Sequence, residues 1–392
     1  MEKDKNSTLQ QLDYTLLFII FLFLCVSIIS IYTAESTNQL SGFAIKQFAW
    51  YMVGGVAIAV IMLIDFDRYR QVAWYLFIFG IITLIPLPLA HHGLLPTCEN
   101  CVIVTNNGAT SWYNLPGAGT IQPSEFMKIF LIIILSHIIM KHHEEYPSKT
   151  VRDDWSLLGK IIGISLIPLA LVAVQPDLGT AMVLASITFS LIVVSGIRWR
   201  IIVLVTLAVV LFIGLNILLY IYFPEHAFLK SYQMDRIYSW LYPHQHENDG
   251  QAYQLLKSLN AVGSGQLFGT GLQNFNLILP EAYTDFIFAV IANEFGFLGA
   301  SLVISLYFLL IYRMIHTSLE IHDRFGSYLC AGVIGMFMFQ VFQNIGMTIQ
   351  IMPITGIPLP FISYGGSSLI TSMIAIGIVL NVRSRKRTYM FD

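Results

Sequence analysis

The chain has 392 residues, of which 56% are hydrophobic and only 11% are charged, and its mean hydropathy is +0.70. A soluble domain has about 25% charged residues, so this composition excludes a soluble globular protein and indicates a polytopic membrane protein. The formal net charge of −2 carries no information about partners. The sequence has no Walker-type glycine-rich loop, so nothing indicates nucleotide hydrolysis.

Apolar segments long enough to span a bilayer recur along the chain. The longer ones cover residues 14–33, 45–64, 72–90, 124–140, 201–223, 286–312, 327–349 and 365–381. Two shorter runs, 158–174 and 178–195, are interpreted as two helices joined by a tight turn at 175–177. The first run has no small-residue cleavage site after it, so we expect it to remain as a helix. The sequence therefore predicts an all-α polytopic membrane protein with about ten transmembrane helices.

Lysine and arginine are unevenly distributed between the loops on the two sides. Sixteen of the 21 lie in the set of loops that includes both termini, so the positive-inside rule predicts that both termini are cytoplasmic. The loop at 91–121, the turn at 175–177, a large loop at about 224–284 between helices 7 and 8, and the segment 350–364 are then extracellular. The basic run at 383–387 is interpreted as a topology anchor, with a lipid-binding patch as the alternative.

A charged pair begins the fourth span. Ser124 is a candidate N-cap for this helix. Glu125 and Lys128 are three residues apart, so their side chains can pair on one helix face. The pair could only lock helix packing, or it could keep a cation at the outer rim for a phosphate group, and the sequence leaves both open.

The turn between the fifth and sixth spans holds an acid. Pro176 ends one helix, and Asp177 can cap the next. The break would also place a carboxylate and free helix-end amides at membrane depth. Irregular backbone is tolerated there where it lines a wet cavity or is buried in protein, so a binding role for Asp177 also remains open.

The large loop contains a helical pattern and a glycine-rich stretch. Periodicity over 253–262 predicts a helix that could lie in the interface plane. The glycines at 263, 265, 269 and 271 are typical of a close-packed, sharply turning segment. A polar group near the start of the loop resembles a set of metal ligands, but nothing fixes its geometry, and we interpret it as a solvated loop tip: His244, His246, Glu247 and Asp249.

Asp285 lies where this polar loop ends and a long apolar run begins. A carboxylate at such a boundary is partly desolvated, which should raise its pKa. The alternative is an N-terminal helix cap. Glu294 lies nine residues further on, about 13 Å along a helix, and is either a functional polar group at depth or half of a buried pair.

Residues 352–368 are apolar but too rich in proline and glycine to form a helix. Such a run must be held against protein, so we interpret it as a re-entrant or cavity-lining segment that delivers Ser363, Ser367 and Ser368 to a site. A tight surface loop is the alternative. Elsewhere, Cys98 and Cys101 face the exterior, where a disulfide or free thiols are favoured over a metal site.

Several of these stretches together resemble the SEDS family, the RodA, FtsW and SpoVE membrane proteins of bacterial cell-wall synthesis. The short tails are more similar to those of RodA than of FtsW. The matches follow the family order over most of the chain: Gly108-Ala109-x-x-Trp112, Gln122-Pro123-Ser124-Glu125-x-x-Lys128, Pro176-Asp177-Leu178-Gly179-Thr180, Gly263-Ser264-Gly265 with Phe268-Gly269-x-Gly271, Pro280-Glu281-Ala282-x-Thr284-Asp285-Phe286-Ile287-Phe288, and Thr355-Gly356-Ile357-Pro358-Leu359-Pro360-Phe361-Ile362-Ser363-Tyr364-Gly365-Gly366-Ser367.

The resemblance implies that residues 1–392 are a single SEDS-type transmembrane domain in the bacterial cell membrane. It implies a peptidoglycan glycosyltransferase that polymerises lipid II on the outer face during cell elongation. A class B penicillin-binding protein, which supplies the transpeptidase, is the implied partner, and no nucleic acid is expected. The family's catalytic acid falls on Asp285, its rim pair on Glu125 and Lys128, and its broken-helix acid on Asp177.

The sequence departs from the family pattern in three ways. Tyr283 stands where relatives often have histidine. Leu277 stands where some relatives have an acid. Thr110 and Ser111 stand without the arginine that often precedes the tryptophan.

The implied reaction needs a base and cations. A sugar hydroxyl must attack an anomeric carbon while a lipid diphosphate leaves, and Asp285 is the predicted base because its pKa should be raised toward the working pH. Few cations are available outside to hold the diphosphate, and the first two are favoured because they lie in matched motifs: Lys128, Arg236, Lys257 and Lys230. A divalent cation, Mg or Mn, could share this task, but no ligand cluster demands one.

Two other functions remain open at this stage. One is a lipid II flippase, which would need a polar path through the whole membrane. Glu294, Gln343 and Asn344 are polar groups at depth, but no matching series reaches the cytoplasmic side. The other is a non-catalytic scaffold that activates the penicillin-binding protein and would leave the outer acids dispensable.

Overall fold

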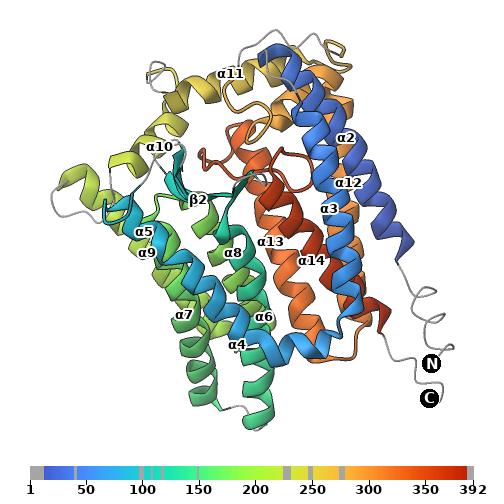
Figure 1. Cartoon of the computed structure of the whole chain (residues 1–392). Coiled ribbons are helices and arrows are strands. Elements are labelled where there is room, and N and C mark those ends of the chain that lie inside the picture. The colour runs from blue at the N-terminus through green and yellow to red at the C-terminus, as the bar shows by residue number, and fades with distance from the viewer. Residues whose placement is uncertain are drawn as a thin grey trace.

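The structure is a computed structural model that describes residues 13–38, 42–96, 101–106, 109–115, 119–147, 150–223, 231–245, 250–272 and 279–385 (Figure 1). Its elements in chain order are α2 (Tyr14–Asn38), α3 (Phe43–Leu63), α4 (Phe66–Leu84), α5 (Pro86–His91), β1 (Ile103–Asn106), β2 (Ala109–Leu115), β3 (Gly119–Ile121), α6 (Pro123–Glu145), α7 (Val151–Val174), α8 (Leu178–Val194), α9 (Trp199–Tyr222), α10 (Ser231–Leu241), α11 (Gly250–Ser264), α12 (Ile287–Glu320), α13 (Arg324–Thr348) and α14 (Gly366–Ser384).

All ten predicted apolar segments form helices. In the described residues, nine helices are long and apolar enough to cross a membrane, and α8 is a shorter apolar helix. The all-α membrane fold is therefore confirmed. The largest differences lie at helix ends: α12 continues to Glu320, and α7 begins at Val151 because Thr150 and Asp153 form a capping box there.

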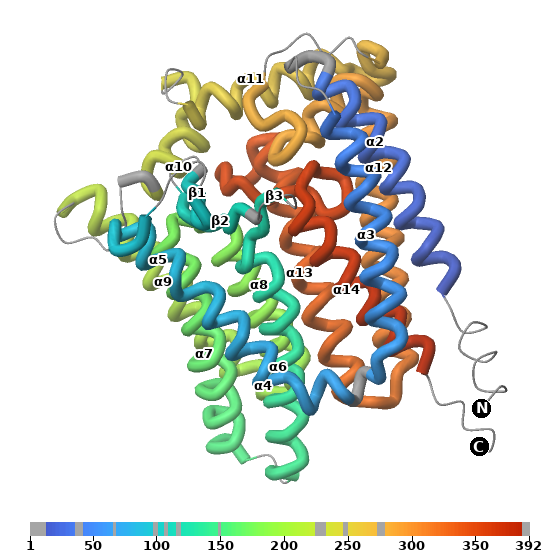
Figure 2. Tube along the Cα trace, viewed as in Figure 1, coloured from blue at the N-terminus to red at the C-terminus, as the bar shows by residue number. Residues whose placement is uncertain are grey.

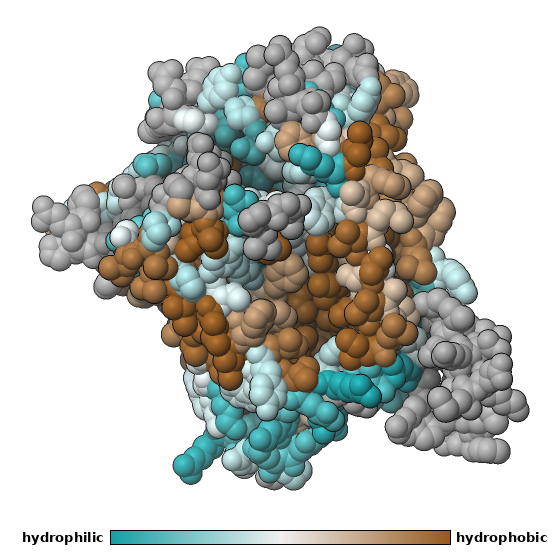
Figure 3. Space-filling view, in the orientation of Figure 1, coloured by the Kyte–Doolittle hydropathy of each residue, from teal (hydrophilic) through white to brown (hydrophobic). Residues whose placement is uncertain are grey.

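The helices form one bundle, and α10 and α11 cross one end of it (Figures 1 and 2). We call this the loop end. The first turn of α2 and the last turn of α14 lie together at the opposite end, which we call the terminal end. A broad hydrophobic band crosses the visible face, and hydrophilic residues gather at the terminal end (Figure 3). The two ends match the two sides that the sequence predicted, and the assignment of the terminal end to the cytoplasm stays a prediction.

A small antiparallel sheet, which the sequence analysis missed, lies at the loop end. Its order is β1-β2-β3, with Val104 opposite Trp112 and Tyr113 opposite Ile121. The strands are rich in β-branched and aromatic residues, which favour this conformation. The Tyr113 hydroxyl donates to the carbonyl of Thr83, 3.0 Å away, and ties β2 to α4. Because β3 ends just before α6, the sheet fixes where α6 begins.

Helix α12 is broken near its start, where the apolar run had predicted one continuous helix. Gly296 has φ +62°, and the freed backbone groups bond to the glycine-rich segment at 265–271: Thr270 N donates to Asn293 O (2.9 Å), and Phe297 N donates to Gln266 O (2.8 Å). A Cβ on Gly265 would lie 1.9 Å from the carbonyl oxygen of Ala292. The predicted close-packed, turning segment is therefore confirmed, and so is the helix over 253–262, which lies within α11.

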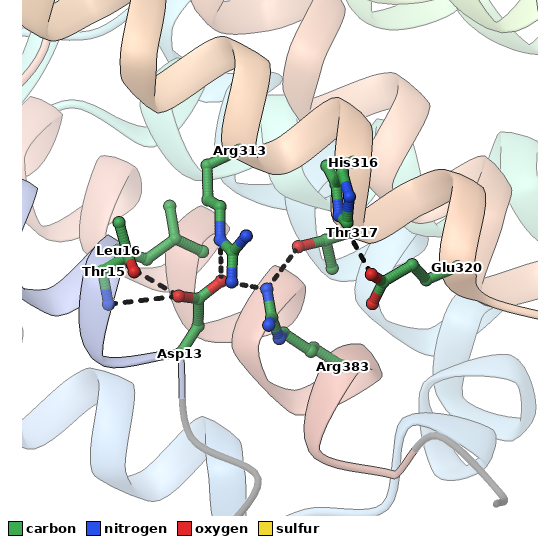
Figure 4. A network of polar contacts seen from close by, with 8 residues as sticks. All are labelled: Asp13, Thr15, Leu16, Arg313, His316, Thr317, Glu320 and Arg383. Atoms are coloured by element: carbon green, nitrogen blue, oxygen red, sulfur yellow. Dashed lines mark hydrogen bonds and ion pairs between the residues drawn. The ribbon is translucent and has the colours of Figure 1, made fainter.

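An ion-paired cluster joins three helices at the terminal end (Figure 4). Asp13 accepts hydrogen bonds from the backbone of Thr15 (3.1 Å) and Leu16 (3.3 Å), so it caps α2. Its other oxygen pairs with Arg313 of α12 at 2.8 Å and with Arg383 of α14. The start of α2 is thereby held to the C-terminal parts of α12 and α14.

Candidate active site

The segment 350–365 is irregular in backbone and largely buried at the loop end. The residues Gln350, Gly356 and Phe361 all have positive φ. The predicted non-helical, protein-packed segment is confirmed, and the alternative of a surface loop is wrong. We call it the irregular segment.

Side chains from four helices satisfy the carbonyl oxygens of the irregular segment. Lone polar residues in otherwise apolar helices had signalled this only weakly in the sequence, and only Gln343 and Asn344 had been singled out. The bonds are Ser27 Oγ to Ile362 O (2.8 Å), Gln47 Nε2 to Ser363 O (3.1 Å), Tyr51 hydroxyl to Phe361 O (2.6 Å), Tyr307 hydroxyl to Pro360 O, Gln343 Nε2 to Pro353 O (2.8 Å) and Asn344 Nδ2 to Ile357 O (2.8 Å). This backbone is held rigidly, because buried carbonyls without partners would be costly.

Asp285 lies in the turn that leads into α12, and its backbone is fixed on both sides. Asn344 Nδ2 donates to Asp285 O at 2.7 Å, and Ser363 Oγ donates to Thr284 O at 2.6 Å. Tyr364 N donates to Tyr283 O at 2.9 Å. The predicted cap role is wrong: the N-cap of α12 is Phe286, and no described residue donates a hydrogen bond to the Asp285 carboxylate. The turn therefore holds the backbone and leaves the carboxylate available.

The irregular segment runs between Asp285 and the start of α8. A Cβ on Gly356, where φ is +71°, would lie 3.4 Å from Asp285 Oδ2. A Cβ on Gly179 would lie 2.7 Å from Thr355 O. The close approach at Gly179 needs glycine, and residues 355–356 thus lie next to both the start of α8, which Asp177 caps, and the Asp285 carboxylate.

The pKa of Asp285 is raised to about 7, mainly by burial and then by the negative charges of Glu281 and Asp177. The guanidinium of Arg236 lowers it. The predicted upward shift is therefore confirmed. Glu281, four residues upstream, belongs to a matched motif, but the sequence analysis gave it no role. Arg236 Nη1 donates to Ile354 O at 3.1 Å, so α10 is tied to the irregular segment beside the acid.

A second group of polar residues gathers where α6 and α8 begin. Gln122 Nε2 donates to Asp177 Oδ2 at 2.8 Å, and Asp177 also caps α8 by accepting from Thr180 N at 3.0 Å. Burial raises the pKa of Asp177, and its bonds with Thr180 oppose this rise. Glu125 and Lys128 form an ion pair at 2.7 Å. We call Gln122, Glu125, Lys128 and Asp177 the charged flank; the sequence analysis had given Gln122 no role.

Lys128 is more deeply placed than expected. The sequence analysis offered it as a cation at the outer rim, but its side chain is 2% exposed and that of Glu125 is 4% exposed. The reason is that α6 packs against α4, α7, α8, α13 and α14, so its first turn is already inside the bundle. The expected pairing of Glu125 with Lys128 is confirmed, and a role for Lys128 toward substrate stays a prediction.

The remaining predicted residues divide into those near this group and those outside it. Ser367 Oγ accepts from Gln122 N at 3.2 Å, so it borders the charged flank. The Ser363 hydroxyl also accepts from Leu359 N (2.7 Å), so both of its bonds support the backbone near Asp285. Lys257 Nζ lies 5.3 Å from the Tyr253 ring centre on α11, and no described contact joins it to Asp285.

The candidate metal ligands and the cysteines form no part of the polar groups described so far. No cluster of three or more His, Cys, Asp or Glu side chains able to hold a metal occurs in the part of the chain that is described. His246, Glu247, Asp249, Lys230, Leu277 and Cys98 lie outside that part. Cys101 is disulfide-bonded, which agrees with the disulfide alternative.

Comparison with known proteins places this geometry in a family. Residues 8–388 match the model of the FtsW, RodA and SpoVE proteins, described as a cell cycle protein. The chain belongs to this family. It is 33% identical to stage V sporulation protein E of Bacillus subtilis over 96% of this chain and 98% of that protein. It is also 33% identical to the peptidoglycan glycosyltransferase MrdB of Escherichia coli, over 96% and 94% of the two chains.

Solved structures agree on the fold. One chain of a peptidoglycan synthase complex that coordinates polymerization and crosslinking superposes with a TM-score of 0.75, at 25% identity, covering 96% of this chain and 99% of that one. RodA of Thermus thermophilus gives a TM-score of 0.66 at 23% identity, covering 96% and 97%. The protein is thus a multi-pass bacterial membrane protein of this family.

Proposed function

We propose that the chain is a peptidoglycan glycosyltransferase that polymerises lipid II at the loop end. The observation that carries the proposal is Asp285, a partly buried acid whose pKa is raised to about 7 and whose carboxylate receives no hydrogen bond from any described residue. A general base works best when its pKa lies near the operating pH. The names of the relatives, which include peptidoglycan glycosyltransferases, support the same reaction class.

In the proposed reaction, Asp285 accepts the proton of a sugar hydroxyl on one substrate. The hydroxyl oxygen forms a bond to the anomeric carbon of a second substrate, and the bond from that carbon to the diphosphate oxygen breaks. The diphosphate leaves with the electron pair. Arg236 is the cation whose charge acts on Asp285, and we propose that it stabilises the leaving diphosphate.

The charged flank is proposed to order this end of the site. A buried ion pair gains little net stability but fixes geometry when its remaining groups are bonded. The charge of Glu125 raises the pKa of Asp177 and that of Lys128 lowers it, so the group has both signs at the start of two helices. We propose that Lys128 and Asp177 position the substrate head group there, with Ser367 at the border and Lys257 as an outer contact.

A divalent cation is not required by any step above. Mg²⁺ is commonly held by one or two carboxylates together with substrate phosphates. The described residues offer no larger ligand set, so a bound Mg or Mn would depend on the substrate diphosphate for most of its ligands.

We further propose a class B penicillin-binding protein as partner and cell elongation as the process served. The similarity to a chain of a peptidoglycan synthase complex supports a partner that crosslinks. The elongation role rests on the resemblance to RodA, and the relatives also include FtsW proteins and a stage V sporulation protein.

A flippase would need a polar path across the bundle. Gln343 and Asn344 are two of the three polar groups noted at depth, and both donate to carbonyls of the irregular segment. Their positions favour a support for the loop-end site over such a path. A scaffold without catalysis would not need an acid like Asp285, whose pKa is raised and whose carboxylate receives no hydrogen bond from a described residue.

The test is polymerisation of labelled lipid II in detergent, with the penicillin-binding partner present and no two sides to flip between. We expect glycan chains from the wild type and a rate at least about 100-fold lower from Asp285→Asn. Asp323→Asn is the matched control, because it makes the same change at a helix cap at the terminal end, where asparagine caps equally well. Equal rates from wild type and Asp285→Asn would remove Asp285 as the base, and no polymer from wild type would favour the flippase or scaffold.

A further inference from the structure

Three aromatic rings gather where the start of α3 meets the turn that holds Asp285. Phe43 and Tyr283 stack with ring centres 5.1 Å apart and an interplanar angle of 21°. Tyr364 lies edge-on to Phe43 at 4.7 Å and contacts Tyr283 at 6.1 Å. The rings come from the start of α3, the turn before Asp285 and the end of the irregular segment. We call Phe43, Tyr283 and Tyr364 the aromatic flank.

The aromatic flank and the charged flank are built on different helices. Figure 1 shows α3 on one side of α13 and α14, and α6 and α8 on the other. The cations that the mechanism uses, Lys128 and Arg236, are not part of the aromatic flank. A substrate whose diphosphate lies with Arg236 would therefore leave the aromatic rings for a group of different chemistry.

The flank is rigidly held. Tyr364 N donates to Tyr283 O at 2.9 Å, so two of the three residues are joined through the backbone. Glu35 Oε1 accepts from Ala44 N at 2.8 Å and fixes the first turn of α3, next to Phe43. Lys46 Nζ lies 5.4 Å from the Phe43 ring centre, so this ring is supported by a cation as well as by Tyr283. Preorganised rings lose little entropy on binding a ligand.

These rings differ from the aromatic cluster that only packs the bundle. Phe23 contacts both Tyr307 and Phe361, but each of these three is at most 2% exposed, and the Tyr307 hydroxyl bonds to Pro360 O. The rings of the aromatic flank are only partly buried. The hydroxyls of Tyr283 and Tyr364 make no hydrogen bond to any described residue. A buried tyrosine hydroxyl normally has a partner, so these two hydroxyls are available to a ligand.

We propose that the aromatic flank is a sugar-binding subsite, in which Tyr283 and Tyr364, backed by Phe43, bind the pyranose ring that presents the attacking hydroxyl. The inference rests on the proposed glycosyltransferase function and deepens it. A pyranose has C–H faces that pack on aromatic rings, and hydroxyl and acetamido groups that can bond to a phenol. Tyr283 is two residues from Asp285, so a sugar ring on this flank would bring its hydroxyl close to the base.

The experiment separates sugar binding from diphosphate binding. In the Asp285→Asn background, which prevents turnover, we would measure the affinity for lipid II and for undecaprenyl diphosphate, which has the same lipid and diphosphate but no sugars. Tyr283→Leu removes the ring and keeps apolar volume. It is expected to weaken lipid II binding about fivefold to tenfold, with undecaprenyl diphosphate unchanged. Tyr364→Leu is expected to do the same.

Two further variants serve as controls for this experiment. Tyr283→Phe keeps the ring and should retain most of the lipid II affinity. Phe308→Leu is the matched control, because Phe308 stacks on Tyr312 at 6.3 Å on an exposed face of α12, away from Asp285, and it should change neither affinity. Unchanged lipid II binding by Tyr283→Leu, or an equal loss for both ligands, would overturn the subsite.

The subsite and the proposed function fail in different ways. If wild type polymerises lipid II but the parent background binds lipid II and undecaprenyl diphosphate equally, the subsite is wrong and the enzyme remains. If wild type makes no polymer while the aromatic variants lose lipid II selectively, the rings bind sugar and the proposed catalysis is wrong.

Discussion

Asp13 and Asp285 are the same residue type, each close to the start of a transmembrane helix, yet their surroundings are opposite. Asp13 at the terminal end is 1% exposed and receives two backbone N–H groups and two guanidinium groups (Figure 4). Asp285 at the loop end receives hydrogen bonds only at its backbone carbonyl, and no described group donates to its carboxylate. A carboxylate surrounded by donors holds helices together, whereas one that is left without donors has a raised pKa and can accept a proton.

The largest stability effect is expected from Asp13→Asn. Removing one partner of a buried ion pair costs about 3–5 kcal/mol. Here Arg313 and Arg383 keep side-chain exposures of 25% and 20%, so we expect a loss of about 3 kcal/mol. The measurement is thermal unfolding in detergent, with polymerisation normalised to folded protein. Asp323→Asn, a cap at the same end with no ion pair in the structure, should change stability little.

The contrast between the two acids predicts that Asp13→Asn leaves the rate per folded molecule unchanged. A variant that kept full stability but lost polymerisation would contradict it, because Asp13 would then act on the site rather than on the bundle.

The second effect is smaller and has the opposite sign: Asp285→Asn should stabilise the protein at neutral and higher pH. The pKa of Asp285 rises from an ordinary value of 3.8 to about 7 on folding. Between these values the folded state binds more protons than the unfolded state, so wild-type stability falls as pH rises through this window. Asparagine does not titrate, so the variant should gain about 1–3 kcal/mol over wild type near pH 8, after allowance for the partial exposure of the group.

Unfolding temperatures of both proteins at pH 5 and pH 8 check this prediction. The difference should be small at pH 5 and larger at pH 8. A difference that is equal at the two pH values would mean that burial does not raise the pKa of Asp285, and the comparison with Asp13 would lose its basis.

The sequence predicted the spans and the location of Asp285 well, because these depend on local hydropathy. The features it did not predict depend on contacts between segments that are distant in the sequence. Long apolar runs and the boundary at Asp285 are local signals, because they depend only on hydropathy along the chain. The break at Gly296 was missed because its cause is the segment at 265–271, which approaches it in space. Lys128 was placed at the rim because its burial is set by the helices around α6, and these are distant in sequence.

The polar supports of the irregular segment show the same limit. Ser27, Gln47 and Tyr51 lie in α2 and α3, more than 300 residues from the carbonyls that they bond. Each is a polar residue in a largely apolar run, a pattern that has many explanations. Proline and glycine at 352–368 predicted that the backbone is irregular, but they carry no information on which side chains would satisfy it.

The smallest effects are expected from the two charges that act on Asp285. In wild type, kcat/KM should fall below about pH 7, because the base must be deprotonated in the free enzyme. Glu281→Gln removes a negative charge that raises the pKa of Asp285, so the fall of kcat/KM on the acid side, which we call the acid limb, should move to lower pH. Arg236→Gln removes a positive charge that lowers the pKa, so the limb should move to higher pH. Each shift should be about half a unit to one unit.

The opposite directions make these shifts informative. Glutamine at 281 can still accept the hydrogen bond that Thr284 Oγ1 donates to Glu281 Oε2 at 2.9 Å, so the turn should keep its form. General damage to the site would lower the rate in both variants without separating the acid limb of one variant from that of the other. Limbs that stay together near pH 7 in both variants would show that neither charge acts on the base, and a midpoint near pH 4 in wild type would show that the titrating base is not the donor-free carboxylate of Asp285.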